Sequence, residues 1–157
     1  MSLLRIAADL LTGQAYAVTG ESMAPSFRPG DRLLGDRIGD PTTPLSRGDT
    51  VIVRDPRHDE RRYLKRIVGL PGEELRLTDG VLLVDGHRLP EPYLNGLPAS
   101  PGLDERNWKL EAGKYLLLGD NRAHSADSRD FGPVSLGMVL GRVWFRCWPL
   151  SRWGAIG

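Results

Sequence analysis

The sequence predicts a mainly β domain with a coiled antiparallel sheet, and three observations favour this class. Its 157 residues are enough for one compact domain. The chain contains 19 glycines and 12 prolines, residues that disrupt the interiors of helices. Beyond residue 15, short apolar runs alternate with turn sequences, which is typical of sheets that close or coil to protect their edges.

The charge balance and the cysteine content exclude several classes of function. Lys and Arg number 21 and Asp and Glu 20, so the net charge of +1 argues against a nucleic-acid partner bound through a basic surface. The single cysteine, Cys147, rules out a disulfide framework within the chain, a cysteine-based zinc site and an iron–sulfur cluster. We therefore expect no metal and no cofactor.

Residues 1–14 are expected to form a short N-terminal helix or to be the remnant of an anchor. Apolar residues at positions 3, 4, 7, 10 and 11 lie on one face of a helix. This face could pack on the domain or contact a membrane surface. The sequence has no apolar run of about 20 residues, the length that a membrane-spanning helix requires.

Eight later segments are predicted strands, because each is rich in apolar residues and is bounded by Gly, Pro or Asp turns. They are residues 15–18, 32–37, 50–54, 63–68, 74–77, 81–84, 115–119 and 139–144. Asp79-Gly80, between two apolar runs, is the strongest hairpin signal.

Two further segments are expected to lack regular structure. Residues 88–108 contain four prolines without periodicity and are predicted to be an irregular surface excursion. Together with the hairpin they would form an insertion at about residues 74–114, within a domain of residues 15–157. The charged run at residues 57–62 is expected to be a solvated loop.

Ser22 is a candidate nucleophile. Residues 20–25 read Gly-Glu-Ser-Met-Ala-Pro and follow a predicted strand, so the hydroxyl would be presented on a turn whose N–H groups can face an oxyanion. An α/β-hydrolase elbow is excluded, because it requires a helix directly after the serine and Pro25 and Pro29 prevent one. The three histidines lie in polar loops or turns, so a Ser-His-Asp triad is not expected.

Lys65 is a candidate general base. It is one of only three lysines and lies in the apolar run Tyr-Leu-Lys-Arg-Ile-Val-Gly-Leu of residues 63–70. Alternation along a strand places it on one face with Tyr63 and Ile67. Burial lowers the pKa of a lysine, and a neutral amine can take the proton of a serine hydroxyl. Alternatively, the side chain could extend and keep its charge in solvent.

A third candidate segment, residues 119–130, consists of small and polar residues after an apolar strand. It could be a solvated loop. In an extended segment, however, Asp127 and Arg129 would share a face and could pair. Ser125 would lie on that same face, where a hydroxyl beside an ion pair could orient a lysine amine.

These three segments together resemble the type I signal peptidases, the bacterial leader peptidases with a Ser-Lys dyad. The matching stretches are residues 20–26, 63–73 and 119–129, with supporting matches at 47–51, 85–86, 91–94 and 148–152. The resemblance covers residues 18–153 in order. It implies the coiled antiparallel fold of that family and a bacterial, membrane-bound serine endopeptidase that removes signal peptides from exported preproteins. The catalytic domain would lie on the extracytoplasmic face, and substrates would carry small residues at positions −1 and −3.

Carried over residue by residue, the resemblance assigns a role to each candidate. Ser22 would be the nucleophile and Lys65 the general base. Ser125 would help to orient the lysine amine, and Asp127 and Arg129 would form a supporting pair. The Ser22 backbone N–H would contribute to the oxyanion hole, and its neighbours Gly20 and Met23 would form part of the oxyanion and substrate-binding region.

The chain departs from the family pattern at two points. Some members carry a serine two residues before the nucleophile as a second oxyanion donor, where this chain has Gly20. Members normally have a transmembrane anchor before the nucleophile, whereas 21 residues precede Ser22 here. Either an anchor has been removed, or the N-terminal helix and three tryptophans (Trp144, Trp148 and Trp153) contact the membrane surface.

Two other functions stay open from the sequence. A self-cleaving repressor-type protease would use the same Ser-Lys dyad, but that family lacks the segment found here at residues 119–129. An inactive β domain could bind signal peptides without cutting them, although both dyad positions are intact.

Overall fold

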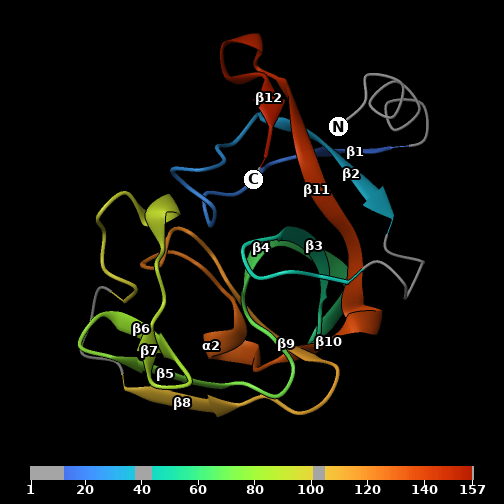
Figure 1. The fold of residues 1–157 in the computed structure, drawn as a ribbon. Coiled ribbons are helices and arrows are strands. Elements are labelled where there is room, and N and C mark those ends of the chain that lie inside the picture. The colour runs from blue at the N-terminus through green and yellow to red at the C-terminus, as the bar shows by residue number, and fades with distance from the viewer. Residues whose placement is uncertain (1–12, 38–43, 101–104, 157) are drawn as a thin grey trace.

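The computed structural model describes residues 13–37, 44–100 and 105–156, and the expected N-terminal helix lies outside these ranges. The described chain consists mainly of antiparallel strands, which confirms the predicted fold class (Figure 1). The strands are β1 (Gln14–Ala17), β2 (Arg32–Arg37), β3 (Thr50–Asp55), β4 (His58–Gly69), β5 (Glu74–Thr78), β6 (Val81–Val84), β7 (His87–Arg88), β8 (Arg106–Lys109), β9 (Lys114–Leu118), β10 (Val134–Ser135), β11 (Val139–Trp148) and β12 (Gly154–Ala155). One short helix, α2 (Ser128–Phe131), and three 3-10 turns, η1 (Pro92–Leu94), η2 (Leu136–Met138) and η3 (Leu150–Arg152), lie between them.

The larger of two sheets carries the candidate catalytic segments. Its strand order is β1-β2-β11-β3-β4-β9-β10, with β12 paired to β11. Long strands of this sheet have register shifts, for example between Ile67 and Gly69 in β4 and between Val143 and Phe145 in β11. Such irregularities bend a strand and increase its twist, so they account for the predicted coiling of the sheet.

The smaller sheet has the order β7-β6-β5-β8 and lies at the end of the molecule away from β1 (Figure 1). The predicted hairpin at Asp79-Gly80 is confirmed, because β5 and β6 pair directly across it. Both turn residues have positive φ angles, 48° and 70°, as a tight two-residue hairpin requires.

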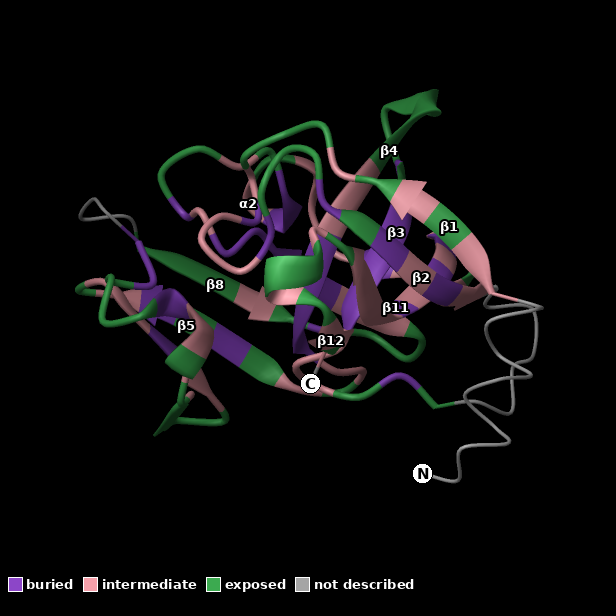
Figure 2. Cartoon of the chain, turned by 90° about the horizontal axis from the view of Figure 1, so that it is seen from above, coloured by how far each residue is buried: buried purple, intermediate pink, exposed green. Residues whose placement is uncertain are grey.

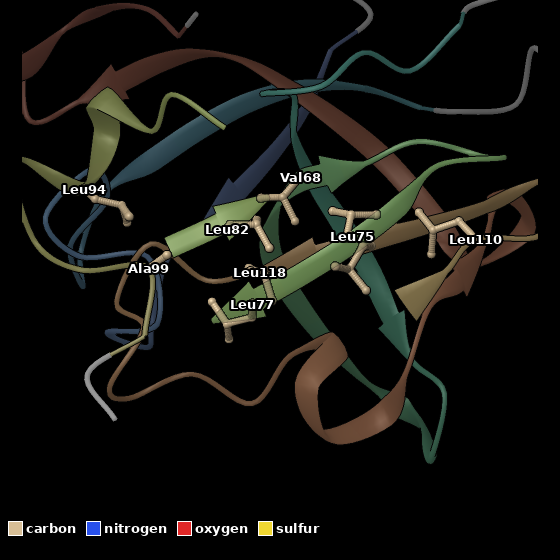
Figure 3. Packing of buried hydrophobic residues seen from close by; sticks show 9 residues of the cluster. Val68, Leu75, Leu77, Leu82, Leu94, Ala99, Leu110 and Leu118 are labelled. Carbon is tan, nitrogen blue, oxygen red and sulfur yellow. The ribbon is translucent and has the colours of Figure 1, made fainter. Parts of the chain in front are cut away.

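A leucine-rich cluster joins the two sheets (Figure 3). Val68 of β4 and Leu118 of β9 face Leu75 and Leu77 of β5, and all four side chains are almost completely buried. Burying each such side chain contributes roughly 1.5–3 kcal/mol. Gly69 permits the close approach, since a Cβ atom there would lie 2.7 Å from Leu75 Cδ1 and 2.9 Å from Leu116 Cβ.

The expectation of a loop at residues 57–62 was wrong, and the expectation of an irregular segment at residues 88–108 holds only in part. The charged run at residues 57–62 belongs mostly to β4, which extends the β3–β4 hairpin as an exposed ribbon (Figure 2). Its side chains face solvent, but the backbone pairs with β3. Residues 88–108 include η1 and the start of β8, which pairs with β5. An edge strand of four residues with one partly buried side chain leaves too weak an apolar alternation to be found in the sequence.

Within the described ranges, no helix has the length and apolar character needed to cross a bilayer.

Candidate active site

The turn that carries Ser22 is fastened just after β1. The Val18 N–H donates to the Asp31 carbonyl at 2.9 Å, and the Gly30 N–H donates to the Val18 carbonyl at 2.9 Å. Residues 20–27 then form turns and no helix, as the prolines predict. Throughout the described part of the chain, the Ser22 backbone N–H has no hydrogen-bond acceptor, so it can donate to a bound group.

Lys65 reaches Ser22 from the middle of β4. Its residue is 1% exposed, and its Nζ donates to Ser22 Oγ at 2.8 Å and to the Leu64 carbonyl at 3.0 Å. Nζ also lies 5.0 Å from the centre of the Tyr63 ring, which agrees with the predicted shared face. The Lys65 amine is therefore buried, and the alternative that the side chain extends into solvent is wrong.

The pKa of Lys65 is lowered from 10.5 to about 8, chiefly because burial penalises the ammonium form. The negative charges of Asp127 and Asp120 oppose this shift, and the positive charge of Arg129 adds to it. No carboxylate of the described residues forms an ion pair with Lys65. A substantial fraction of the amine is consequently neutral in mildly alkaline solution, as a general base must be.

The segment after β9 closes over the Ser22 turn. Gly119 has no room for a side chain, because a Cβ atom would lie 2.4 Å from the Ser22 carbonyl oxygen and 2.2 Å from Ser125 Oγ. The Asn121 N–H donates to the Ser22 carbonyl at 3.0 Å, and the Asn121 side chain donates to the Glu21 carbonyl at 3.2 Å. Residues 119–121 therefore hold the turn that carries Ser22 through its backbone.

Asp127 and Arg129 form the predicted ion pair, although the segment is not extended. Asp127 is the N-cap of α2, and its carboxylate accepts from Arg129 Nε and Nη2, both at 2.9 Å. It also accepts from the Gly119 N–H at 3.0 Å. These hydrogen bonds outweigh the burial of the carboxylate and lower the pKa of Asp127. Asp127 and Arg129 come together because the Asp127 carboxylate caps the first turn of α2, where it also accepts from the Arg129 backbone N–H.

Ser125 lies in this region without a hydrogen bond to the lysine. Its Oγ is buried and has no hydrogen-bond partner among the described residues, and the two acceptors of Lys65 Nζ are Ser22 and Leu64. The hydroxyl packs against Gly119 instead. The expectation that it orients the amine stays a prediction.

A cleft of about 450 Å³ opens over the Ser22 and Lys65 side chains. Gly20 lines it with space for a larger residue, since no atom lies within 4 Å of a Cβ atom built there. Met23 also lines it, but its side chain is 1% exposed and belongs to a hydrophobic core cluster with Phe27 and Leu33.

A sequence model of the family described as "Signal peptidase, peptidase S26" matches residues 2–148. The chain belongs to the signal peptidase family. Signal peptidase IB of Staphylococcus aureus (strain N315) is 34% identical over 152 residues, which cover 87% of this chain and 78% of that protein. Signal peptidase I of Leptolyngbya laminosa is 32% identical over 166 residues, covering 99% and 78%. The crystal structure of a signal peptidase I from Enterococcus faecalis V583 is 30% identical with a TM-score of 0.56, covering 64% of this chain and 97% of that chain.

The family confirms the resemblance drawn from the three motifs. The chain is a serine endopeptidase that cleaves signal peptides from preproteins. The repressor-type alternative and the inactive binding domain are set aside, because the matching proteins are signal peptidases.

The sequence reasoning missed two contributors to the site. Asn121 lies in the segment of residues 119–129, but the sequence predicts no role for it, since its contacts with the Ser22 turn depend on the fold. Arg66 was passed over although a signal existed: an arginine inside an apolar strand needs a buried carboxylate. Its partner is Asp120, with Nε and Nη2 donating at 2.9 and 2.7 Å.

Proposed function

We propose that Ser22 is the nucleophile of this signal peptidase and Lys65 its general base. The observation that carries the assignment is the 2.8 Å contact between Lys65 Nζ and Ser22 Oγ, with the amine buried and unpaired by any carboxylate of the described residues. The neutral amine takes the hydroxyl proton while Ser22 Oγ attacks the carbonyl carbon of the scissile bond. The resulting ammonium then protonates the departing amine, and an acyl-enzyme remains for hydrolysis by water, again with Lys65 as the base.

The Ser22 N–H is proposed to stabilise the oxyanion of the tetrahedral intermediate. Its freedom from any acceptor in the described chain supports this role. Gly20 supplies no side-chain donor, so a second donor would have to come from backbone or water. Asp127 and Arg129 are proposed to support the site by fixing Gly119, and Ser125 by packing beside it.

The substrate is proposed to bind as an extended peptide between β1 and β4. Among the described strands, β1 pairs with β2 and Tyr63 to Lys65 of β4 pair with β3, and residues of both strands line the cleft from two sides. An added strand is a common mode of peptide recognition. The cleft is lined at Ala17 and Val18 by small and medium apolar side chains, which fits a preference for small residues at −1 and −3.

An apolar patch is proposed to bring the catalytic domain to the extracytoplasmic membrane surface. Trp148, Leu150 and Trp153 are 50%, 70% and 62% exposed at the β11–β12 end. Tryptophans are favoured at membrane interfaces because one end of the ring is apolar and the other polar. Trp144 does not fit this role, since its indole nitrogen is buried.

The assignment is tested with purified protein and a preprotein that carries an Ala-x-Ala site, in detergent micelles. Ser22→Ala and Lys65→Met are expected to abolish release of the mature protein. Lys109→Met is the matched control, because that lysine is 82% exposed in a surface ion pair, and it should cleave normally. Normal processing by either dyad variant would overturn the proposed mechanism.

A further inference from the structure

The insertion touches both segments that carry the candidate catalytic residues. Residues 91–93, here called the strap, run along the start of η1. The Tyr93 ring covers the guanidinium of Arg66, with 4.2 Å between the guanidinium carbon and the ring centre. Glu91 meets Arg122, which follows the segment over Ser22. Arg66 is the sequence neighbour of Lys65. The strap therefore contacts a residue next to Lys65 and, through Arg122, the segment that lies over Ser22.

The Glu91–Arg122 pair is buried almost completely, with side chains 6% and 3% exposed. Arg122 Nη2 donates to Glu91 Oε1, and Nη1 donates to Oε2 at 3.3 Å. The Tyr93 hydroxyl donates to the same carboxylate at 2.6 Å. Burial and the Glu91 charge raise the pKa of Tyr93, so the phenol keeps the proton that it donates. The carboxylate is thus fixed from two sides.

Arg122 connects Glu91 to residues 119–121, the segment that lies over Ser22. Its Nε donates to the Gly119 carbonyl at 3.0 Å, and its Nη1 donates to the Ala99 carbonyl of the insertion at 3.0 Å. Asn121, the residue before Arg122, donates its N–H to the Ser22 carbonyl, and Gly119 lies so close to this carbonyl that a Cβ atom would be 2.4 Å from its oxygen. Three steps therefore connect Glu91 to the backbone of the nucleophile: Glu91 to Arg122, Arg122 to Gly119, and Gly119 to the Ser22 carbonyl.

We propose that Glu91 is a positioning residue for signal-peptide cleavage, which acts through Arg122 to hold residues 119–121 against the Ser22 turn. This inference rests on the proposed roles of Ser22 and Lys65. A buried ion pair is by itself weak grounds for a stability role, because desolvation of both charges offsets their attraction. Placement of a reacting group is a stronger effect, since an error of about 1 Å can cost about 10²-fold in rate.

The test compares Glu91→Gln with Glu74→Gln. The glutamine at 91 keeps one acceptor for Arg122 and removes the charge. Glu74 lies in the same insertion and pairs with Lys109, but both side chains are largely exposed, so its variant is a matched control. The readouts are kcat and KM for a preprotein, and the pKa of Lys65 by NMR of protein with 13C-labelled lysine. The three lysines of the chain make this spectrum simple to assign.

For Glu91→Gln we expect kcat to fall about 10-fold or more with KM changed less than about twofold. The pKa of Lys65 should rise toward its ordinary value, because a loosened segment admits water to the amine. Glu74→Gln should match the wild type in all three quantities.

A folded Glu91→Gln protein with wild-type kcat and an unchanged Lys65 pKa would overturn the proposal. If Glu91→Gln does not fold, Tyr93→Phe replaces it: the ring stays on Arg66 and only the hydrogen bond to Glu91 is lost. A lower kcat with an unaltered KM would then support the proposal, and wild-type kcat would overturn it. Failure of the wild-type protein to cleave preproteins would instead contradict the proposed function, and the NMR readout would still test Glu91.

Discussion

Lys65 and Arg66 are neighbours in β4, project to opposite faces of the sheet and are 1% and 5% exposed. Arg66 lies on the carboxylate of Asp120, donates to the Gly48 carbonyl at 2.8 Å and is covered by the Tyr93 ring. Among the described residues, the acceptors of Lys65 Nζ are a hydroxyl and a carbonyl, those of Ser22 and Leu64. On one face of β4 the charge of Arg66 is balanced by Asp120, whereas on the other face no carboxylate of the described residues forms an ion pair with Lys65.

This difference in surroundings suits Arg66 to stabilising the fold and Lys65 to the proposed proton transfer. The guanidinium cannot lose its proton in a protein, so its burial is tolerated only with an anion beside it. The amine can lose its proton, and burial without an anion lowers its pKa to about 8. Asp127 and Asp120, whose negative charges oppose the lowering of the Lys65 pKa, form ion pairs with Arg129 and Arg66.

The largest expected effect is a loss of activity when Lys65 is replaced by arginine, the residue type of its neighbour Arg66. Lys65→Arg keeps the positive charge but cannot act as a base, so kcat/KM for a preprotein should fall by roughly 10⁴-fold. Steady-state cleavage measures the loss, and circular dichroism checks that the variant is folded. Activity within tenfold of the wild type would show that the base lies elsewhere.

Removing the paired cation should affect stability instead. Arg66→Met leaves Asp120, which is completely buried, without its counter-charge, and we expect the free energy of unfolding to fall by about 3–5 kcal/mol. Urea unfolding measures this change. Arg54→Met is the control, because its pair with Asp59 is exposed and spans 3.7 Å, and it should change stability by less than about 0.5 kcal/mol. Equal effects of the two variants would contradict the contrast between the pairs.

Removing the Lys65 amine should change stability in the opposite direction, so that the free energy of unfolding rises. The folded pKa of Lys65, about 8, lies below the ordinary 10.5, so the native state is penalised at neutral pH and gains stability as pH rises between these values. Lys65→Met should therefore be more stable than the wild type by about 3 kcal/mol at pH 7, with the difference shrinking above pH 8. Thermal unfolding at pH 7 and pH 10 measures it. A destabilised variant at pH 7 would mean that the amine is stabilised in place.

Local patterns in the sequence predicted much of this arrangement. The alternation around Lys65 placed it beside Tyr63, and the prolines after Ser22 excluded a helix there. Asp79-Gly80 located the hairpin of the smaller sheet.

Contacts between distant segments could not be predicted in this way. The Arg66–Asp120 pair joins residues 54 positions apart, and Glu91 lies 31 positions from Arg122. Both depend on how the sheet coils and how the insertion packs, which no local pattern records. Asp127 and Arg129 are instructive in another sense, because they pair as expected but through the cap of α2 rather than along an extended chain.

The pKa of Lys65 in the free enzyme tests the central claim most directly. Titration of the lysine resonances in 13C-labelled protein should give a pKa of about 8 for Lys65. The Lys65→Met variant should lack the resonance that titrates near 8, which assigns that resonance to Lys65. A value near 10.4 for Lys65 would contradict its role as a base made neutral by burial.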